Sequence, residues 1–351
     1  MKTQETYEIN GYGQARRYAA LAVMVLHFTG FALHTVGRRS ILLSLIRSLV
    51  LCFPGVVVLF VLSGYLVTAS YEKLLQSSST ESEATAEFLI KRAKRIFPPL
   101  WLCTILNVIV IVLLGGWRRI GTLLFWMITQ ITGIAWTPSA FKGFATGSLN
   151  GALWTIFVQL QLYILTTFFF PAMRKRDKKT WERWLVIALV VNLFCAFLGG
   201  VIPGAGVLLK ILQRTFIPYT VYYLAGMYLY VHRDVLLPRI RKSWIPLLVI
   251  YLVAYRLPLT GFGYYTGWAT TLLLPPLVIA AGEMLPERTS YLPDITYELF
   301  LCHWIVLNVF MHLNILQTWP LLIALLLFVA LSYGAAYLVW MARKKYLEKY
   351  L

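Results

Sequence analysis

Apolar runs long enough to cross a lipid bilayer recur along the whole chain and limit what it can fold into. A membrane-spanning helix needs about 20 consecutive apolar residues. Of the 351 residues, 59% are hydrophobic and only 13% are charged. The sequence therefore predicts an all-α, polytopic integral membrane helical bundle, a single domain over residues 1–351. We expect about ten transmembrane helices, at roughly 17–36, 50–70, 96–114, 150–171, 183–202, 210–231, 243–257, 266–284, 291–314 and 319–341.

The basic residues indicate which side of the membrane each loop occupies. The chain carries 32 Lys and Arg against 14 Asp and Glu, a formal net charge of +18. Most of these cations lie in short loops, where they favour the cytoplasmic side and contact with anionic lipids over nucleic acid. Ten crossings leave both termini on that side of a multi-pass plasma membrane protein, together with the basic segments at 91–95, 173–183, 232–243 and 343–345.

Two segments fit this topology less simply. The run 120–136 is apolar, but an eleventh crossing there would move every later basic loop to the wrong side, so we expect it to be interfacial or re-entrant. The cations between the first two spans would lie outside, against the positive-inside rule; they are Arg38, Arg39 and Arg47.

The polar segments are expected to lie between or beyond the spans. We expect a cytoplasmic N-terminus at 1–15, a flexible cytoplasmic loop at about 72–90, an external segment at 137–149 and a cytoplasmic tail at 342–351. The four cysteines all lie in apolar runs with no CxxC spacing, which favours packing over disulfides or metal ligation; they are Cys52, Cys103, Cys195 and Cys302. No metal site is expected.

Two polar residues of the first apolar run are the leading functional candidates. Arg16 begins the run, and His27 lies eleven positions later, roughly 16 Å along a helix and about half the hydrocarbon thickness. Eleven residues make close to three turns, so both side chains project from about the same face. A titratable imidazole at that depth is costly unless it faces protein or water. The alternatives are positive-inside anchoring for Arg16 and a hydrogen-bonded core histidine for His27.

Two further stretches place polar groups within an expected span or just before one. Ser63-Gly64 inside an apolar run favours close helix packing, with Ser63 a candidate for a substrate pocket. Arg92 and Arg95 are three apart, hence neighbours on one helical face. Two guanidiniums there could clamp a phosphate; the alternative is a basic stop beside the membrane.

Amides and ionisable groups also occur within later spans. Gln159 and Gln161, flanked by Trp154 and Tyr163, indicate either a polar lining or satisfied interhelical hydrogen bonds. A later stretch follows Asp294, a suitable N-cap, and contains Tyr297, Glu298 and His303. Five positions separate Glu298 from His303, a poor spacing for an intrahelical pair, so each is expected to meet another helix.

Taken in order, these stretches resemble the motifs of the membrane-bound acyltransferase-3 family of integral membrane O-acyltransferases, over about residues 12–310. The matching segments are Arg16 with His27, Phe60–Tyr65, Arg92–Pro98, Trp154–Tyr163 and Thr296–His303. The resemblance implies ten membrane helices, no bound cofactor, and a cytoplasmic acyl-CoA, usually acetyl-CoA, as cosubstrate. It implies Arg16 and His27 as the catalytic and donor-binding pair, and Arg92 and Arg95 as ligands of the CoA phosphates.

One position departs from the family pattern. Gln159 stands where the family commonly has Glu, and an amide cannot act as a general base. The candidates for the substrate pocket are Ser63, Trp154, Gln159, Tyr163, Tyr297, Glu298 and His303.

The leading hypothesis is an O-acetyltransferase that acts on a hydroxyl of a cell-surface polysaccharide or its lipid-linked precursor. His27 would act as general base or carry the acetyl group transiently. A permease or flippase for a small solute or glycan lipid is the alternative from another class, and Gln159 lends it some weight. A sensor or assembly subunit using the same pocket is a third reading.

Overall fold

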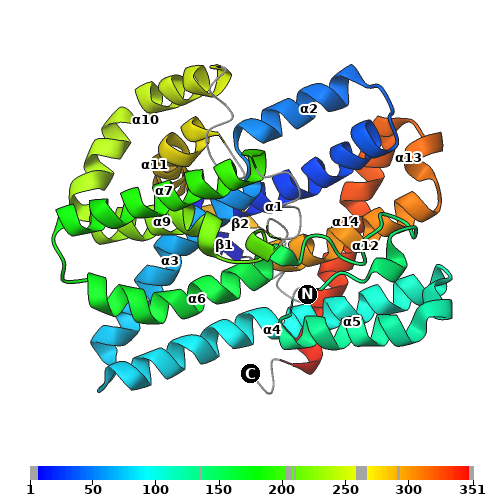
Figure 1. The fold of residues 1–351 in the computed structure, drawn as a ribbon, viewed down its shortest axis with the longest axis horizontal. Coiled ribbons are helices and arrows are strands. Elements are labelled where there is room, and N and C mark those ends of the chain that lie inside the picture. The colour runs from blue at the N-terminus through cyan, green and yellow to red at the C-terminus, as the bar shows by residue number, and fades with distance from the viewer. Residues whose placement is uncertain are drawn as a thin grey trace, which may run out of the picture. The chain divides into compact units, whose positions relative to one another are not determined.

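The computed structural model describes residues 7–134, 136–201, 208, 211–257, 267–290 and 293–347, and its regular structure is almost entirely helical (Figure 1). The helices are α1 (Gly11–Gly30), α2 (Ile41–Cys52), α3 (Gly55–Ser77), α4 (Glu81–Leu113), α5 (Ile120–Thr132), α6 (Trp154–Met173), α7 (Lys178–Val201), α9 (Thr220–Val231), α10 (Arg233–Arg256), α11 (Trp268–Met284), α12 (Thr296–His312), α13 (Ile315–Thr318) and α14 (Leu321–Tyr346). Strands β1 (Tyr7–Ile9) and β2 (Arg288–Ser290) pair antiparallel, with Tyr7 opposite Ser290.

Six helical stretches of the described chain are long and apolar enough to cross a membrane. They are Gly11–Thr35, Ile41–Ser77, Glu81–Leu113, Trp154–Met173, Lys178–Leu198 and Leu321–Tyr346, and each overlaps an expected span. The other expected spans coincide with α9 to α12, which are shorter or more polar. The protein is therefore a polytopic helical membrane protein.

Helix α5 has 13 residues, roughly 20 Å, which is shorter than a bilayer's hydrocarbon core. Parts of several predicted segments lie outside the described residues, at 1–6, 135, 202, 210, 266, 291–292 and 348–351.

The prediction of a flexible loop at about 72–90 is wrong. Helix α3 continues to Ser77 and α4 begins at Glu81, so only residues 78–80 are non-helical. The reason is a local cap. The Glu83 N–H donates to Thr80 Oγ1 at 3.2 Å, and the Ser79 N–H donates to Glu83 Oε2 at 3.1 Å, in the manner of a capping box. This reciprocal pair satisfies donors at the start of α4 despite the low-complexity composition.

The chain divides into two compact units, and the first comprises Met1–Ala19, Cys52–Lys91 and Val158–Tyr291. Its helices α3 and α9 lie side by side (Figure 1). Gly64 and Gly226 permit this approach: a Cβ on Gly64 would lie 2.0 Å from Tyr223 O, and one on Gly226 would lie 2.2 Å from Val61 O. Small residues at such crossings allow helix backbones in membranes to pack closely.

The second unit comprises Ala20–Leu51, Arg92–Phe157 and Leu292–Leu351. Its core joins the second half of α1 to α12 and α14. Phe328 of α14 contacts Phe28 and Phe310, with ring centroids 5.2 and 5.8 Å apart. Helix α2, which the sequence did not predict, buries Leu43 in the same core. These helices hold the polar groups of the candidate site.

Candidate functional site

The second unit brings together two of the predicted site residues, His27 of α1 and His303 of α12. The His27 Nδ1 and His303 Nε2 atoms lie 2.8 Å apart, and the two rings are stacked with an interplanar angle of 5°. His303 is fully buried at 0% exposure, whereas His27 is only partly buried. The expectation that His303 meets another helix is confirmed, and His27 is the member of the pair that remains accessible.

One set of neutral tautomers satisfies both histidines. His303 Nδ1–H donates to Leu299 O at 3.3 Å, one turn earlier in α12, which leaves His303 Nε2 as an acceptor. His27 Nδ1–H then donates to that nitrogen, so the lone pair of His27 lies on Nε2. An imidazole oriented in this way can take up a proton at Nε2 without losing its hydrogen bond.

The indole of Trp304 forms one wall beside His27. Its ring lies edge-on to His27, with centroids 4.7 Å apart. Trp304 Nε1–H donates to Thr146 Oγ1 and to Ser148 O, both at 3.1 Å. The segment before α6 therefore fixes the indole, and Gly151 leaves room for it, because a Cβ there would lie 2.4 Å from the ring.

Arg47 of α2 donates hydrogen bonds to α1 on both sides of His27, to the backbone of Leu26 and to the side chain of Thr29. Its Nη1 donates to Leu26 O at 2.9 Å and to Thr29 Oγ1 at 3.3 Å. The sequence singled out this arginine only as an exception to the positive-inside rule. This exception is the sequence signal for a structural role of Arg47, because a cation on the side of the membrane that the positive-inside rule disfavours needs a partner in the fold.

Glu298 is also paired with another helix, as expected. It is 2% exposed, and its Oε1 lies 3.3 Å from Nη2 of Arg343 on α14. The charge of Arg95 also acts on this carboxylate. Its neighbour Tyr297 donates through its hydroxyl to Ile96 O at 3.2 Å, which ties α12 to the helix that carries Arg92 and Arg95. The sequence does not indicate this role of Arg343, because the residue lies among the cations of the basic segment 343–345.

The first unit holds Arg16, Ser63, Gln159 and Tyr163. Gln159 Nε2 donates to Ser63 Oγ at 2.8 Å, so these two candidates contact each other. Gln161 donates to Arg214 O at 2.9 Å and accepts from the Phe216 N–H at 3.0 Å. Both amides therefore have hydrogen-bond partners within the unit.

Tyr163 and Trp154 are the remaining candidates for the substrate pocket. Tyr163 is 8% exposed and its ring packs edge-on against Phe88 at 6.3 Å. Trp154 is half-buried at the first position of α6. The four cysteines are free thiols in the structure. Among the described residues, no group of three or more His, Cys, Asp and Glu side chains is placed to hold a metal ion.

Comparison with known proteins gives a family for this arrangement. The model of the acyltransferase-3 family, described as an acyltransferase domain, matches residues 12–341. A similar protein is Nodulation protein 10 of Rhizobium leguminosarum bv. viciae, 30% identical over 186 residues, which are 50% of this chain and 46% of that protein. The chain thus spans about half the length of this curated relative. No solved structure matches this chain. Since the family model covers nearly the whole sequence, the chain belongs to the acyltransferase-3 family of membrane acyltransferases.

Proposed function

We propose that the protein transfers an acetyl group from cytoplasmic acetyl-CoA to a hydroxyl of a cell-surface polysaccharide or its lipid-linked precursor. The observation that carries this proposal is the contact between His27 and His303, because it leaves one imidazole nitrogen of His27 oriented with a free lone pair on a side chain that is only partly buried. Membership of the family supports acyl transfer. Acetyl-CoA, the glycan acceptor and the plasma membrane location are proposed.

The reaction requires a base and a leaving group that departs with its electrons. His27 Nε2 takes the proton of the acceptor hydroxyl while the hydroxyl oxygen attacks the thioester carbonyl. The C–S bond then breaks, CoA leaves as the thiolate, and the proton on His27 can pass to that sulfur. His303 is a positioning residue, since it holds the Nδ1–H of His27 and stabilises the imidazolium that forms.

Basic residues of α1 and α4 are the proposed ligands of the CoA phosphates. Arg92 and Arg95 lie one turn apart on α4, and their guanidiniums suit the phosphates of CoA. Arg16 of α1 is the third proposed ligand. Tyr163, Trp154 and the Ser63–Gln159 pair remain proposed parts of the substrate pocket, with Tyr297 and Glu298. We further propose one domain with ten crossings and both termini cytoplasmic.

The function is tested by mass analysis of surface glycans from a deletion strain and from the same strain carrying the gene. The complemented strain should regain a mass shift equal to one acetyl group on a glycan fragment. Purified protein should also bind acetyl-CoA. Binding without any acetylated glycan would contradict the acceptor class, and the absence of both would favour the permease or flippase alternative.

A Gly151→Ala variant should lower acetyl transfer because the added methyl group displaces Trp304 from His27. Its Cβ would lie 2.4 Å from two ring carbons of Trp304, closer than real Cβ contacts allow. Such overpacking costs about 1–3 kcal/mol, and we expect transfer to fall by roughly tenfold. The matched control is Gly334→Ala on α14, where a Cβ meets nothing within 4 Å. Equal rates in the two variants would contradict this role of Gly151.

An Arg47→Met variant should also slow transfer, because it removes the donor to the Leu26 carbonyl and the Thr29 hydroxyl, which lie on either side of His27. Small misplacements near reacting groups can cost about 10²-fold, and we expect a loss of at least tenfold. Arg39→Met is the control: it removes the same charge from an exposed position of the same segment. If both variants lose activity equally, loop charge and not the contact with α1 is responsible.

A further inference from the structure

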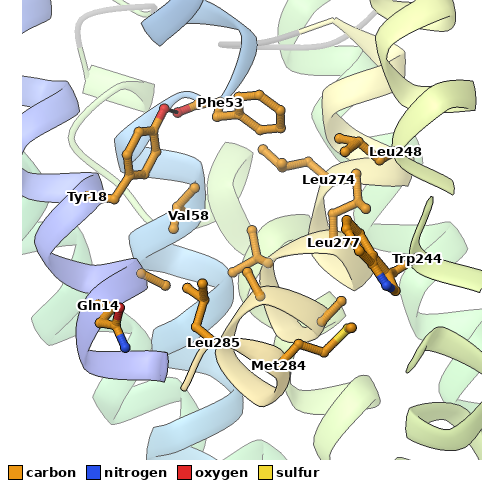
Figure 2. A pocket seen from close by; sticks show the side chains of 14 residues that line it. Gln14, Tyr18, Phe53, Val58, Trp244, Leu248, Leu274, Leu277, Met284 and Leu285 are labelled. Carbon is orange, nitrogen blue, oxygen red and sulfur yellow. Dashed lines mark hydrogen bonds between the residues drawn. The ribbon is translucent and has the colours of Figure 1, made fainter. Parts of the chain in front are cut away.

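The first unit contains a cavity that the proposed chemistry does not use. It has a volume of about 440 Å³ and lies among α1, α3, α10 and α11 (Figure 2). Figure 2 shows Gln14 and Tyr18 of α1 on one side, and Leu274, Leu277 and Trp244 on the other. Most of the lining side chains are aliphatic or aromatic, and the volume falls in the range of ligand pockets in proteins.

The cavity opens among apolar side chains on the surface of the unit. Tyr18, Met284 and Leu285 line it and are also 39%, 43% and 40% exposed. In a membrane protein, such side chains suit the hydrocarbon of the bilayer. An apolar void forfeits dispersion contacts on its lining and takes up apolar molecules, not water. The natural occupant is therefore a hydrocarbon chain that enters from the lipid.

The length of the cavity suits one leaflet. Along α11 its lining extends from Leu274 to Leu285, eleven positions and roughly 16 Å of helix. This is about half the hydrocarbon thickness of a bilayer, hence the reach of one phospholipid chain. A polyprenyl chain longer than one leaflet would not be contained.

Polar groups and charges of both signs lie near one end of the cavity. Gln14 donates to Pro286 O there, and Glu283, next to Met284, accepts from both Tyr12 and Arg241. Arg239, Arg241 and Lys242 lie within five residues of Trp244, which lines the cavity. These three cations outnumber the two carboxylates within three residues of Met284, Glu283 and Glu287, and this excess favours an anionic headgroup, at about 1 kcal/mol for each basic residue near a membrane surface.

We propose that this cavity binds one acyl chain of an anionic phospholipid, with the lipid phosphate beside the turn of α10 that carries Arg239, Arg241 and Lys242. The site is distinct from the histidine pair and does not depend on catalysis. Its ligand would be a resident lipid of the leaflet that faces the start of α1.

Native mass spectrometry of the full, delipidated protein tests the proposal. Titration with phosphatidylglycerol should give one tightly bound lipid per chain, and phosphatidylcholine should bind at least fivefold more weakly. Ala281→Phe, which fills the cavity, should lose that lipid. The control is Ala196→Phe on α7, a half-buried alanine of the same unit that does not line the cavity. The double variant Arg239→Gln, Lys242→Gln should bind both lipids equally.

Loss of lipid in both Phe variants, retention in both, or equal binding of the two lipids by the wild-type protein would overturn the proposal. Tighter binding of a polyprenyl phosphate would overturn the choice of occupant. A second measurement needs no cavity-filling variant. Dibrominated phosphatidylglycerol should quench more fluorescence of the wild-type protein than of Trp244→Phe, and equal quenching would count against the site.

Discussion

His27→Ala should lose acetyl transfer by a factor of about 10²–10⁴, the usual contribution of a positioned general base. His303→Ala should lose roughly ten- to hundredfold, because it removes a hydrogen bond to a group that becomes charged in the transition state, worth about 1.5–3 kcal/mol. The measurement is the initial rate of radiolabelled acetyl incorporation from acetyl-CoA into membrane glycans. Both variants should be expressed and inserted at wild-type levels.

Two controls distinguish chemistry from packing. His312→Ala makes the same substitution near the end of α12, where the ring contacts Phe144 at 5.4 Å, and it should retain activity. His303→Gln keeps an acceptor for the His27 Nδ1–H and should recover part of the rate. If His303→Gln is as slow as His303→Ala while both fold normally, the hydrogen bond to His27 is not the source of the effect.

Arg343→Met should destabilise the protein by about 3–5 kcal/mol, the cost of leaving a buried charge without its partner. Glu298 is 2% exposed and its carboxylate lies 3.3 Å from Arg343, so water cannot replace the lost cation. The effect should be measured as a lower midpoint of thermal unfolding for the purified protein.

A double variant makes this prediction specific. Arg343→Met combined with Glu298→Gln removes both charges and should recover most of the lost stability. Lys344→Met is the control, since it removes a neighbouring charge that lies over the Trp340 ring at 5.3 Å. Additive losses in the double variant would show that the two side chains act independently.

The sequence was informative about elements and about which polar groups need partners. Hydropathy predicted the spans, and ionisable groups within apolar helices predicted that Glu298 and His303 each meet another helix, which is confirmed by Arg343 and His27. It could not identify those partners, because no local pattern links α12 to α1 or α14. Nor could the sequence decide whether Gln159 lines a pocket or makes a structural hydrogen bond. In the structure its amide contacts Ser63.

Local chemistry outweighed composition where the predictions were wrong. The composition of the Ser- and Glu-rich stretch near 80 predicts a flexible loop, yet Thr80 and Glu83 have the spacing of a helix cap. Arg47 violates the positive-inside rule, but its place beside His27 depends on α2, a helix that hydropathy does not predict. The roles of Arg16, Arg92 and Arg95 stay predictions, as does the topology.

The contact between His27 and His303 has a consequence for biosynthesis. The two residues are 276 positions apart. A ribosome that adds about 5–20 residues per second needs roughly 14–55 s to reach α12 after it has made α1. During that interval α1 carries its imidazole without the later partner, which is costly in lipid. The histidine pair is therefore completed only near the end of translation, and a chain that stops before α12 can insert but cannot form it.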